Sequence, residues 1–333
     1  MTDAAGAGAP PPAPPGAGPE VLTMGRVGVD LYPEQAGVPL AAVRTFAKSL
    51  GGTATNVAVA AARLGRRAAL ITKVGDDGFG TYVREALTGF GVDARYVGTD
   101  PVLRTPVVFC ELNPPEDPPL LFYRQPSAPD IQLRLDELDL ATIAAVPLFW
   151  VTGTGLSAEP SRSATLGALD ARGRRPITVL DLDWRPMFWD DPAEATGIYR
   201  DALRRVTVVV GNRAEAAVAV GTAEPDEAAS RLLDLGVELA IVKRGGDGAL
   251  VATAGARVEV PPVEVPVVCG LGAGDAFGGA LCHALLAGMP PGQAVRLANA
   301  AGAIVVSRLA CADAMPTMDE IEALLGEDAG AGG

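Results

Sequence analysis

Hydrophobic residues along the chain form short continuous runs that alternate with longer segments of helical period. The runs are rich in Val, Ile and Leu without polar alternation, which is typical of strands buried on both faces of a parallel sheet. We predict six such strands, at 21–29, 68–75, 147–153, 176–183, 206–212 and 239–245. We predict helices between them at 56–65, 82–91, 161–173 and 227–236. This repeated order predicts a doubly wound α/β fold, with a mostly parallel sheet and helices on both faces.

Two segments interrupt the alternation of strands and helices. Residues 30–50 and 102–125 contain short extended pieces and prolines, and the second reads as strands at 105–112 and 120–124 joined by a Pro-rich turn. Neither segment fits a strand–helix–strand unit, so we expect both to form a small β-sheet lid that can close over a ligand. The edges of such a sheet offer a way to pair two copies into a homodimer.

The two ends of the chain differ from the rest in composition. Residues 1–19 are rich in Pro, Gly and Ala and cannot bury a core, so we expect a disordered tail, one domain over 20–325 and a flexible end at 326–333. The N-terminus lacks the basic and apolar parts of a signal peptide, and no apolar run reaches the roughly 18 residues of a membrane span. We therefore expect a cytoplasmic protein without membrane contact.

Charge and residue usage exclude several classes of function. The 333-residue chain has a net charge of −13 and no run of Lys and Arg, so we expect no nucleic-acid partner. Four scattered cysteines and a single histidine, His283, give neither a zinc pattern nor a disulfide framework, and we expect His283 to be structural. The dipeptide Gly-Lys is absent, which excludes a P-loop. The GTGLSA stretch at 153–158 is weak evidence for dinucleotide binding, and a tight turn at a strand end explains it better.

The stretch CGLGAGDAF at 269–277 carries the clearest chemistry. Small residues at 272–274 let backbone N–H groups approach an anion, and Phe277 opens a helix with an apolar residue at every fourth position. The N-terminus of a helix attracts phosphate. Asp275 is therefore either a plain helix cap or a base for a hydroxyl that attacks that phosphate. A cap would not require the glycines, so the motif favours phosphoryl transfer.

At this motif the chain resembles the PfkB carbohydrate kinases, which have a ribokinase-like fold. Three further motifs of that family occur in order, namely Gly51-Gly52 with Asn56, GDDGFG at 75–80, and Asn212 with Glu215. The resemblance covers residues 20–320. Within the family, the segments at 24–35, 151–162, 180–189 and 307–317 resemble the branch acting on 5-dehydro-2-deoxy-D-gluconate in myo-inositol catabolism. The resemblance thus implies a kinase that uses ATP and Mg²⁺ to phosphorylate the 6-hydroxyl of that sugar acid.

The resemblance also implies a role for individual residues. It makes Asp275 the catalytic base, with an anion hole from the backbone of Gly272, Ala273 and Gly274. It gives the acceptor sugar Asp30, at the end of the first strand, together with Gly52 and Asn56. It implies that the nucleotide is bound by a further set of residues, namely Asn212, Glu215, Lys243, Gly245, Gly248, Gly272, Gly274 and Asn299. Glu215 would also hold Mg²⁺, through water. From the residues alone, Asp30 could instead be a turn residue and Asn56 a helix cap.

One position departs from the family pattern. Many members carry an Asp-Thr pair, associated with a monovalent-cation site, where this chain has Cys269. The resemblance therefore gives no support for activation by potassium.

Two arginines bear on the acceptor. Arg124 ends a predicted lid strand and Arg185 follows a strand end, and ligands bind at the strand ends of doubly wound sheets. Related kinases of keto-deoxy sugar acids hold the carboxylate with arginines at such motifs, a bidentate role that suits guanidinium. Ordinary surface ion pairs are the alternative. Other acceptors of the same fold remain open, namely 2-keto-3-deoxygluconate, fructose or a nucleoside. A non-catalytic sugar-binding regulator is a further alternative, against which the intact GAGD argues.

Overall fold

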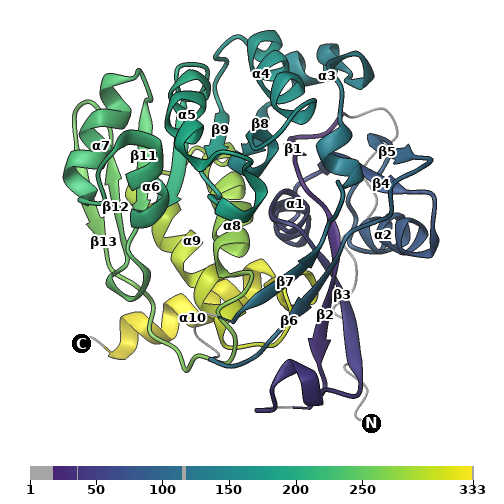
Figure 1. The fold of residues 1–333 in the computed structure, drawn as a ribbon. Coiled ribbons are helices and arrows are strands. Elements are labelled where there is room, and N and C mark those ends of the chain that lie inside the picture. Colours follow the sequence, from purple (N-terminus) through teal and green to yellow (C-terminus); the bar gives the residue numbers. More distant parts are fainter. Residues whose placement is uncertain (1–17, 36, 115–117, 332–333) are drawn as a thin grey trace.

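The computed structural model describes residues 18–35, 37–114 and 118–331 and contains a large sheet with helices on both faces (Figure 1). Nine strands make this main sheet, in the order β13-β12-β11-β10-β9-β8-β1-β4-β5. Their bounds are β1 Val21–Met24, β4 Ala68–Gly75, β5 Val97–Asp100, β8 Leu148–Thr152, β9 Thr178–Asp181, β10 Val208–Asn212, β11 Leu239–Lys243, β12 Ala249–Ala252 and β13 Arg257–Val260. All pairs from β5 to β11 are parallel, and β12 and β13 add antiparallel neighbours at one edge. The predicted doubly wound fold is confirmed.

Helices cover both faces because successive side chains of each strand point to opposite sides. Along β8, Leu148 and Trp150 join the core beneath α1, α8 and α9, whereas Phe149 and Val151 join the core beneath α4 to α7. The helices are α1 Thr53–Arg63, α2 Gly78–Gly89, α3 Leu140–Ala145, α4 Ser161–Arg172, α5 Ala195–Leu203, α6 Arg213–Val220, α7 Pro225–Asp234, α8 Ala273–Leu286, α9 Pro291–Val306 and α10 Met318–Ala331. Two covered faces explain why the strands read as continuous hydrophobic runs.

The ends of the chain differ in how far the structure reaches. Of the tail predicted at 1–19, only residues 18 and 19 lie within the described part. At the other end α10 runs through Ala331, so a helix occupies most of the segment expected to be a flexible end at 326–333. Within the described residues, no helix combines the length and the apolar character needed to cross a membrane.

The first predicted strand, 21–29, is wrong as a single element. The chain leaves the main sheet after β1 and turns at 25–27, and β2 (Gly28–Pro33) then belongs to a second sheet. The break is hidden in the sequence because apolar residues continue on both sides of it. As a consequence, Asp30 lies in the middle of a strand of the second sheet and not at the end of a main-sheet strand.

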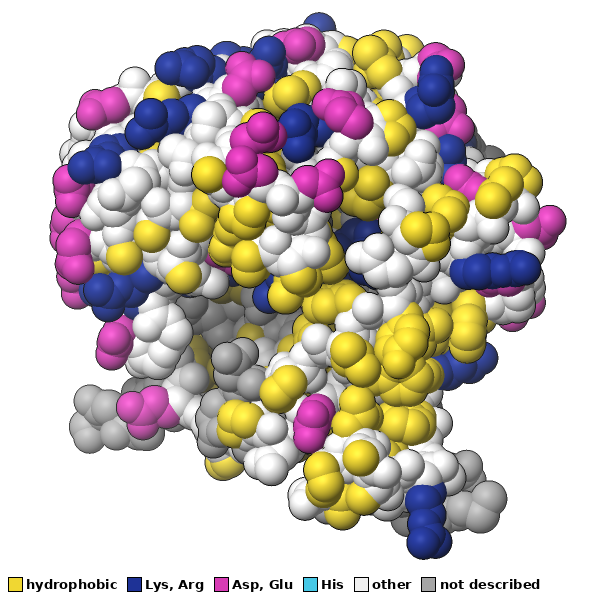
Figure 2. Space-filling model, viewed as in Figure 1, with side chains coloured by type: hydrophobic (Ala, Val, Ile, Leu, Met, Phe, Trp, Pro, Cys, Tyr) yellow, Lys and Arg dark blue, Asp and Glu magenta, His cyan; other side chains and the backbone are white. Residues whose placement is uncertain are grey.

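The second sheet, called the lid sheet below, has four strands in the order β3-β2-β6-β7. The further strands are β3 Phe46–Gly51, β6 Val107–Cys110 and β7 Leu120–Tyr123, so the two segments predicted to form a lid do make one sheet. Residues in register across it share a face. One face therefore carries Ser49, Asp30, Val108 and Phe122, and the other carries Lys48, Leu31, Phe109 and Leu121. The sheet projects below the main body, beside the start of α8 (Figure 1), and hydrophobic side chains gather on the side seen in Figure 2.

Candidate active site

Asp275 and Asn56 meet although they are far apart in the sequence. Asn56 Nδ2 donates a hydrogen bond of 2.7 Å to Asp275 Oδ2. Asp275 is the third residue of α8, whose N-cap is Gly272, and Asn56 is the fourth residue of α1, whose N-cap is Gly52. Neither side chain is therefore the N-cap of its own helix. The interpretations of the two residues as simple caps do not apply.

The amide oxygen of Asn56 is left without a partner. The residue is 2% exposed, and Oδ1 is buried with no hydrogen bond among the described residues. Buried amide oxygens are normally paired, so an unpaired one beside a carboxylate fits a ligand that donates from a hydroxyl. The Asn56–Asp275 pair thus has an acceptor free for a sugar hydroxyl.

The carboxyl group of Asp275 has the properties of a base near neutral pH. Burial raises its pKa, while the hydrogen bond from Asn56 and the positive charge of Arg26 lower it, and the balance is a value of about 6. A carboxylate with such a pKa is ionised at pH 7 and still able to take up a proton. The position therefore suits general-base chemistry.

Asp30 approaches this pair from the lid sheet. It is 8% exposed, and burial raises its pKa to about 7, although the charge of Arg26 opposes the shift. A Cβ on Gly51 would lie 2.1 Å from Asp30 Oδ1, and a Cβ on Gly52 would lie 2.4 Å from the carbonyl oxygen of Arg26. The di-glycine motif is thus required because the backbone of β3 and α1 passes directly over these groups.

The N-terminus of α8 lies next to the base. Gly272 has φ of +81°, the left-handed conformation that favours glycine, and it turns the chain into the helix. The N–H groups of Ala273 and Gly274 are in the first turn and have no partner within the helix. These backbone donors therefore lie beside Asp275 and are available to a phosphate.

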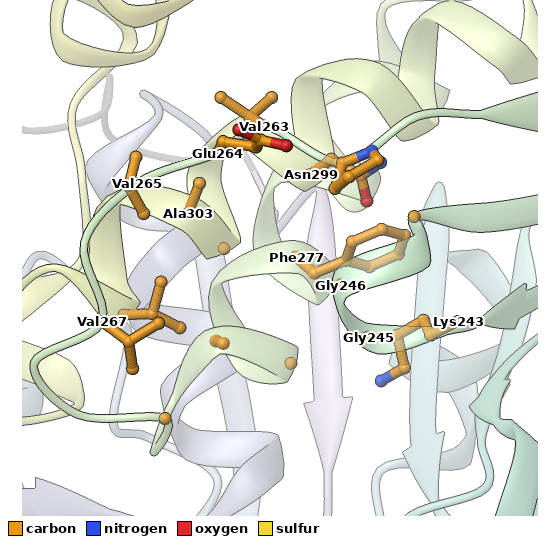
Figure 3. A pocket seen from close by; sticks show the side chains of 17 residues that line it. Lys243, Gly245, Gly246, Val263, Glu264, Val265, Val267, Phe277, Asn299 and Ala303 are labelled. Carbon is orange, nitrogen blue, oxygen red and sulfur yellow. The ribbon is translucent and has the colours of Figure 1, made fainter. Parts of the chain in front are cut away.

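A cavity of about 600 Å³ opens on the other side of the α8 N-terminus (Figure 3). Five of the predicted nucleotide residues line it, namely Lys243, Gly245, Gly248, Gly274 and Asn299. Val265 and Val267 lie on one side in Figure 3, with the Gly245–Gly246 turn on the opposite side. The opposed apolar and glycine-rich walls fit the flat ring of a nucleobase.

Asn212, Glu215 and Gly272 are not among the residues that line this cavity. Asn212 and Glu215 form a capping box at the start of α6, in which Asn212 Oδ1 accepts from the Glu215 backbone and Glu215 Oε2 accepts from the Asn212 backbone at 2.7 Å. Among the described residues Glu215 Oε1 has no hydrogen-bond partner, so one oxygen is free for a hydrated cation. Burial lowers the pKa of Lys243, but the carboxylates of Asp181 and Glu215 outweigh it and raise the value, which keeps the ammonium charged.

The two arginines predicted to hold a carboxylate have different surroundings. Arg124 is buried and bonded at both terminal nitrogens to Asp130, at 2.6 and 3.2 Å, so its fork is already occupied by a protein carboxylate. Arg185 is 40% exposed, and its Nε lies 3.4 Å from Asp183 Oδ1. The structure thus leaves Arg185 more open to a ligand than Arg124.

Sequence reasoning missed two parts of the site. The segment 262–267, together with Phe277 and Ala303, forms much of the cavity wall, and its proline-flanked valines were the only signal. Arg26 was also missed, because it sits inside a hydrophobic run that reads as one strand. Its charge acts on both Asp30 and Asp275.

Known proteins resemble the chain over nearly its whole length. Residues 19–318 match the family described as pfkB family carbohydrate kinase. A 5-dehydro-2-deoxygluconokinase of Photobacterium profundum is 37% identical over 90% of this chain and 92% of its own, and one of Halalkalibacterium halodurans is 33% identical over 93% and 95%. The fructokinase of Vibrio cholerae, solved with fructose, ADP and calcium, has a TM-score of 0.81 at 29% identity over 92% of this chain and 99% of its own. An E. coli protein described as a ribokinase II, solved with ATP and Mg²⁺, has a TM-score of 0.84 at 25% identity over 93% and 99%. The motifs, the fold and these matches agree, and the chain belongs to the pfkB family of carbohydrate kinases.

Proposed function

We propose that the protein uses ATP and Mg²⁺ to phosphorylate the 6-hydroxyl of 5-dehydro-2-deoxy-D-gluconate. The observation that carries the proposal is the Asn56–Asp275 pair, which joins the first turns of α1 and α8 and leaves one buried acceptor unused. The names of the relatives with 30–37% identity support this acceptor.

The proposed chemistry needs one base and a set of anion donors. Asp275 accepts the proton of the 6-hydroxyl as the oxygen forms its bond to the γ-phosphorus, and the bond from that phosphorus to the ADP oxygen breaks. The N–H groups of Gly272, Ala273 and Gly274 stabilise the charge on the transferring group. With a pKa of about 6, the carboxyl group of Asp275 is ionised at pH 7 and can accept this proton.

The acceptor is held from the lid side and from the main sheet. We assign its hydroxyls to Asp30 and Asn56, beneath the close turn at Gly52, and we keep Arg185 as a ligand of its carboxylate. The ion pair with Asp130 gives Arg124 a different task, since Asp130 Oδ2 also accepts from the backbone N–H of Val27 at 2.9 Å. Arg124 thus helps to fix the turn between β1 and β2.

The nucleotide side fits ATP with a bound cation. We assign the base and ribose to the cavity with Gly245, Gly248 and Asn299, and the phosphates to Lys243 and the α8 N-terminus, where a Cβ on Gly274 would lie 3.3 Å from Lys243 Nζ. Glu215 would hold Mg²⁺ through water, with Asn212 beside it. When bound, Mg²⁺ neutralises charge on the phosphates.

An acceptor screen at fixed ATP and Mg²⁺ tests the function. ADP release would be measured with 5-dehydro-2-deoxygluconate, 2-keto-3-deoxygluconate, fructose and a nucleoside. We expect the highest kcat/KM with the first. A higher value with another acceptor would replace the substrate, and no turnover with any of them would favour the non-catalytic regulator.

We also propose that two copies associate through the face of the lid sheet that carries Leu31, Phe109 and Leu121. A groove of about 1190 Å³ on this side is lined by Leu31, Phe79, Phe109, Leu121 and Tyr123 among others, and Leu121 and Tyr123 are 48% and 61% exposed. An apolar face of this kind next to free strand edges suits a second copy. Sedimentation of the wild type and of Leu121→Asp tests it, since only the wild type should form a dimer. A wild-type monomer at micromolar concentration would refute the proposal.

The setting of the protein and its domain limits are part of the same proposal. The four cysteines, Cys110, Cys269, Cys282 and Cys311, are free and buried, which suits the reducing cytoplasm. We take residues 20–325 as the kinase domain, a range supported by the family match at 19–318.

A further inference from the structure

We propose that Arg26 binds the carboxylate of the acceptor beside Arg185 and is the main residue that separates sugar acids from neutral sugars. This inference rests on the proposed function and adds a residue to its acceptor site. Arg26 lies in the turn between β1 and β2, at the point where the chain passes from the main sheet to the lid sheet.

The guanidinium of Arg26 lies among three elements of the crevice. Nη2 donates to Thr53 Oγ1 at 2.7 Å, in the first turn of α1, and Nε is 3.9 Å from Asp183 Oδ2, which follows β9. From the lid side, the ring of Phe122 is centred 5.8 Å from the guanidinium carbon. Phe122 shares its face of the lid sheet with Asp30. Arg26 therefore lies between the lid and the carboxyl edge of the main sheet, where the acceptor is expected.

The hydrogen-bonding capacity of Arg26 is largely unused. Guanidinium has five N–H donors, and Thr53 is its only hydrogen-bond partner among the described residues. The side chain is 10% exposed, and Nε is buried without a hydrogen bond. A buried cation with free donors is costly unless an anion compensates it. These donors fit a carboxylate, which accepts two parallel hydrogen bonds from one guanidinium.

The nearest protein carboxylate does not satisfy this charge by itself. Asp183 lies between two guanidinium groups, with Arg185 Nε at 3.4 Å and Arg26 Nε at 3.9 Å, and it also accepts from Thr154 Oγ1 at 3.0 Å. Its φ of +30° is rare for a residue with a side chain, and such strain gathers at ligand sites. Asp183 is thus shared between two guanidinium groups, and the buried Nε of each has no hydrogen bond among the described residues, so donors are free for the carboxylate of a ligand.

Arg26 is also beside the groups assigned to the acceptor hydroxyls. Its charge lowers the pKa of both Asp30 and Asp275. Arg124, by comparison, donates hydrogen bonds from both terminal nitrogens to Asp130. Among these arginines, Arg26 combines burial, unused donors and closeness to the base.

Its backbone holds the side chain in place. The carbonyl oxygen of Arg26 accepts from Thr55 Oγ1 at 3.1 Å, and Asp130 fixes the N–H of the next residue, Val27. The guanidinium is thus presented from a fixed turn, which a binding residue requires.

The test compares an acid with its neutral counterpart. We would measure kcat/KM for 5-dehydro-2-deoxygluconate and for its carboxamide, which has the same length and no charge. Wild type should prefer the acid by about ten- to a hundredfold, the usual worth of a charge-assisted pair. In Arg26→Gln the acid should lose about that factor while the carboxamide changes little, and Arg26→Lys should keep only part of the preference. Arg257→Gln, at an exposed arginine of β13, is the matched control and should keep the full preference.

The possible results separate this inference from the proposed function. Equal losses on acid and carboxamide in Arg26→Gln would overturn the inference, because Arg26 would then support Asp183 or the base. A wild type that phosphorylates acid and carboxamide equally would also overturn it and would leave the proposed function standing. A wild type without turnover on the acid would refute the function itself. If Arg26→Gln melts at a much lower temperature than wild type, the ratio of kcat/KM for acid and carboxamide in Arg26→Lys decides instead. A ratio equal to that of wild type would refute bidentate binding by the guanidinium.

Discussion

Removal of the amide of Asn56 should move the acid limb of the pH–rate profile to higher pH. The Asn56 Nδ2–Asp275 Oδ2 hydrogen bond of 2.7 Å favours the ionised form of Asp275 and is the strongest influence that lowers its pKa from the level set by burial. A base accepts a proton only when ionised, so kcat/KM should fall as the pH drops through about 6 in the wild type.

The size of the shift follows from the strength of the bond. Hydrogen bonds to charged groups contribute about 1.5–3 kcal/mol, and one pKa unit corresponds to about 1.4 kcal/mol. Asn56→Ala should therefore raise the pKa of Asp275, and the acid limb should move upward by about one to two pH units. The sign is fixed, because loss of a donor can only disfavour the carboxylate.

The assay is kcat/KM for the acceptor between about pH 5 and 9 at saturating ATP and Mg²⁺, with ADP release as the signal. Asn299→Ala is the control, since Asn299 lines the nucleotide cavity and its loss should leave the limb in place. Asp30→Asn shows whether Asp30, with a pKa of about 7, produces the limb instead. An Asn56→Ala profile with the same midpoint as wild type would refute the reasoning, because Asp275 would not be the group that titrates.

Three further predictions follow from the site and its supports. Asp275→Asn should keep ATP binding, measured by calorimetry, while turnover falls by about 10²–10⁴-fold; turnover within a few-fold of wild type would make Asp275 only structural. Glu215→Gln should raise the Mg²⁺ concentration needed for half-maximal rate by a larger factor than it raises the KM for the acceptor. A change in the acceptor KM alone would show that Glu215 does not act on the nucleotide or its Mg²⁺. Arg124→Met leaves the buried carboxylate of Asp130 without its cation, so the free energy of unfolding in urea should fall by about 3–5 kcal/mol. Arg124→Met with Asp130→Leu should recover only part of it, because the Val27 N–H then loses its acceptor. A loss below 1 kcal/mol would show that water reaches Asp130.

The sequence by itself determined the order of elements and the phosphate end of the site. Strands covered on both faces must be continuously hydrophobic, and helices on a sheet must repeat every 3.6 residues, so local pattern is enough to find them. The small residues around Asp275 and the di-glycine before α1 can likewise be recognised locally, because each leaves space for an anion or a neighbouring backbone at its own position in the chain.

Only the tertiary structure decided which side chains meet. Asn56 and Asp275 are 219 residues apart, and no local pattern states that they bond. The break after β1 is invisible because the apolar run continues into the lid sheet, so Arg26 reads as an interruption of a strand and not as a crevice residue. The sequence predicted that Arg124 binds the acceptor carboxylate because it ends a lid strand. In the structure, Asp130, six residues later, pairs with it instead. Periodicity is a property of neighbours in the chain, whereas the partner of a buried charge depends on how distant segments pack, and this is why the sequence indicated the chemistry but not the pairing of its charges.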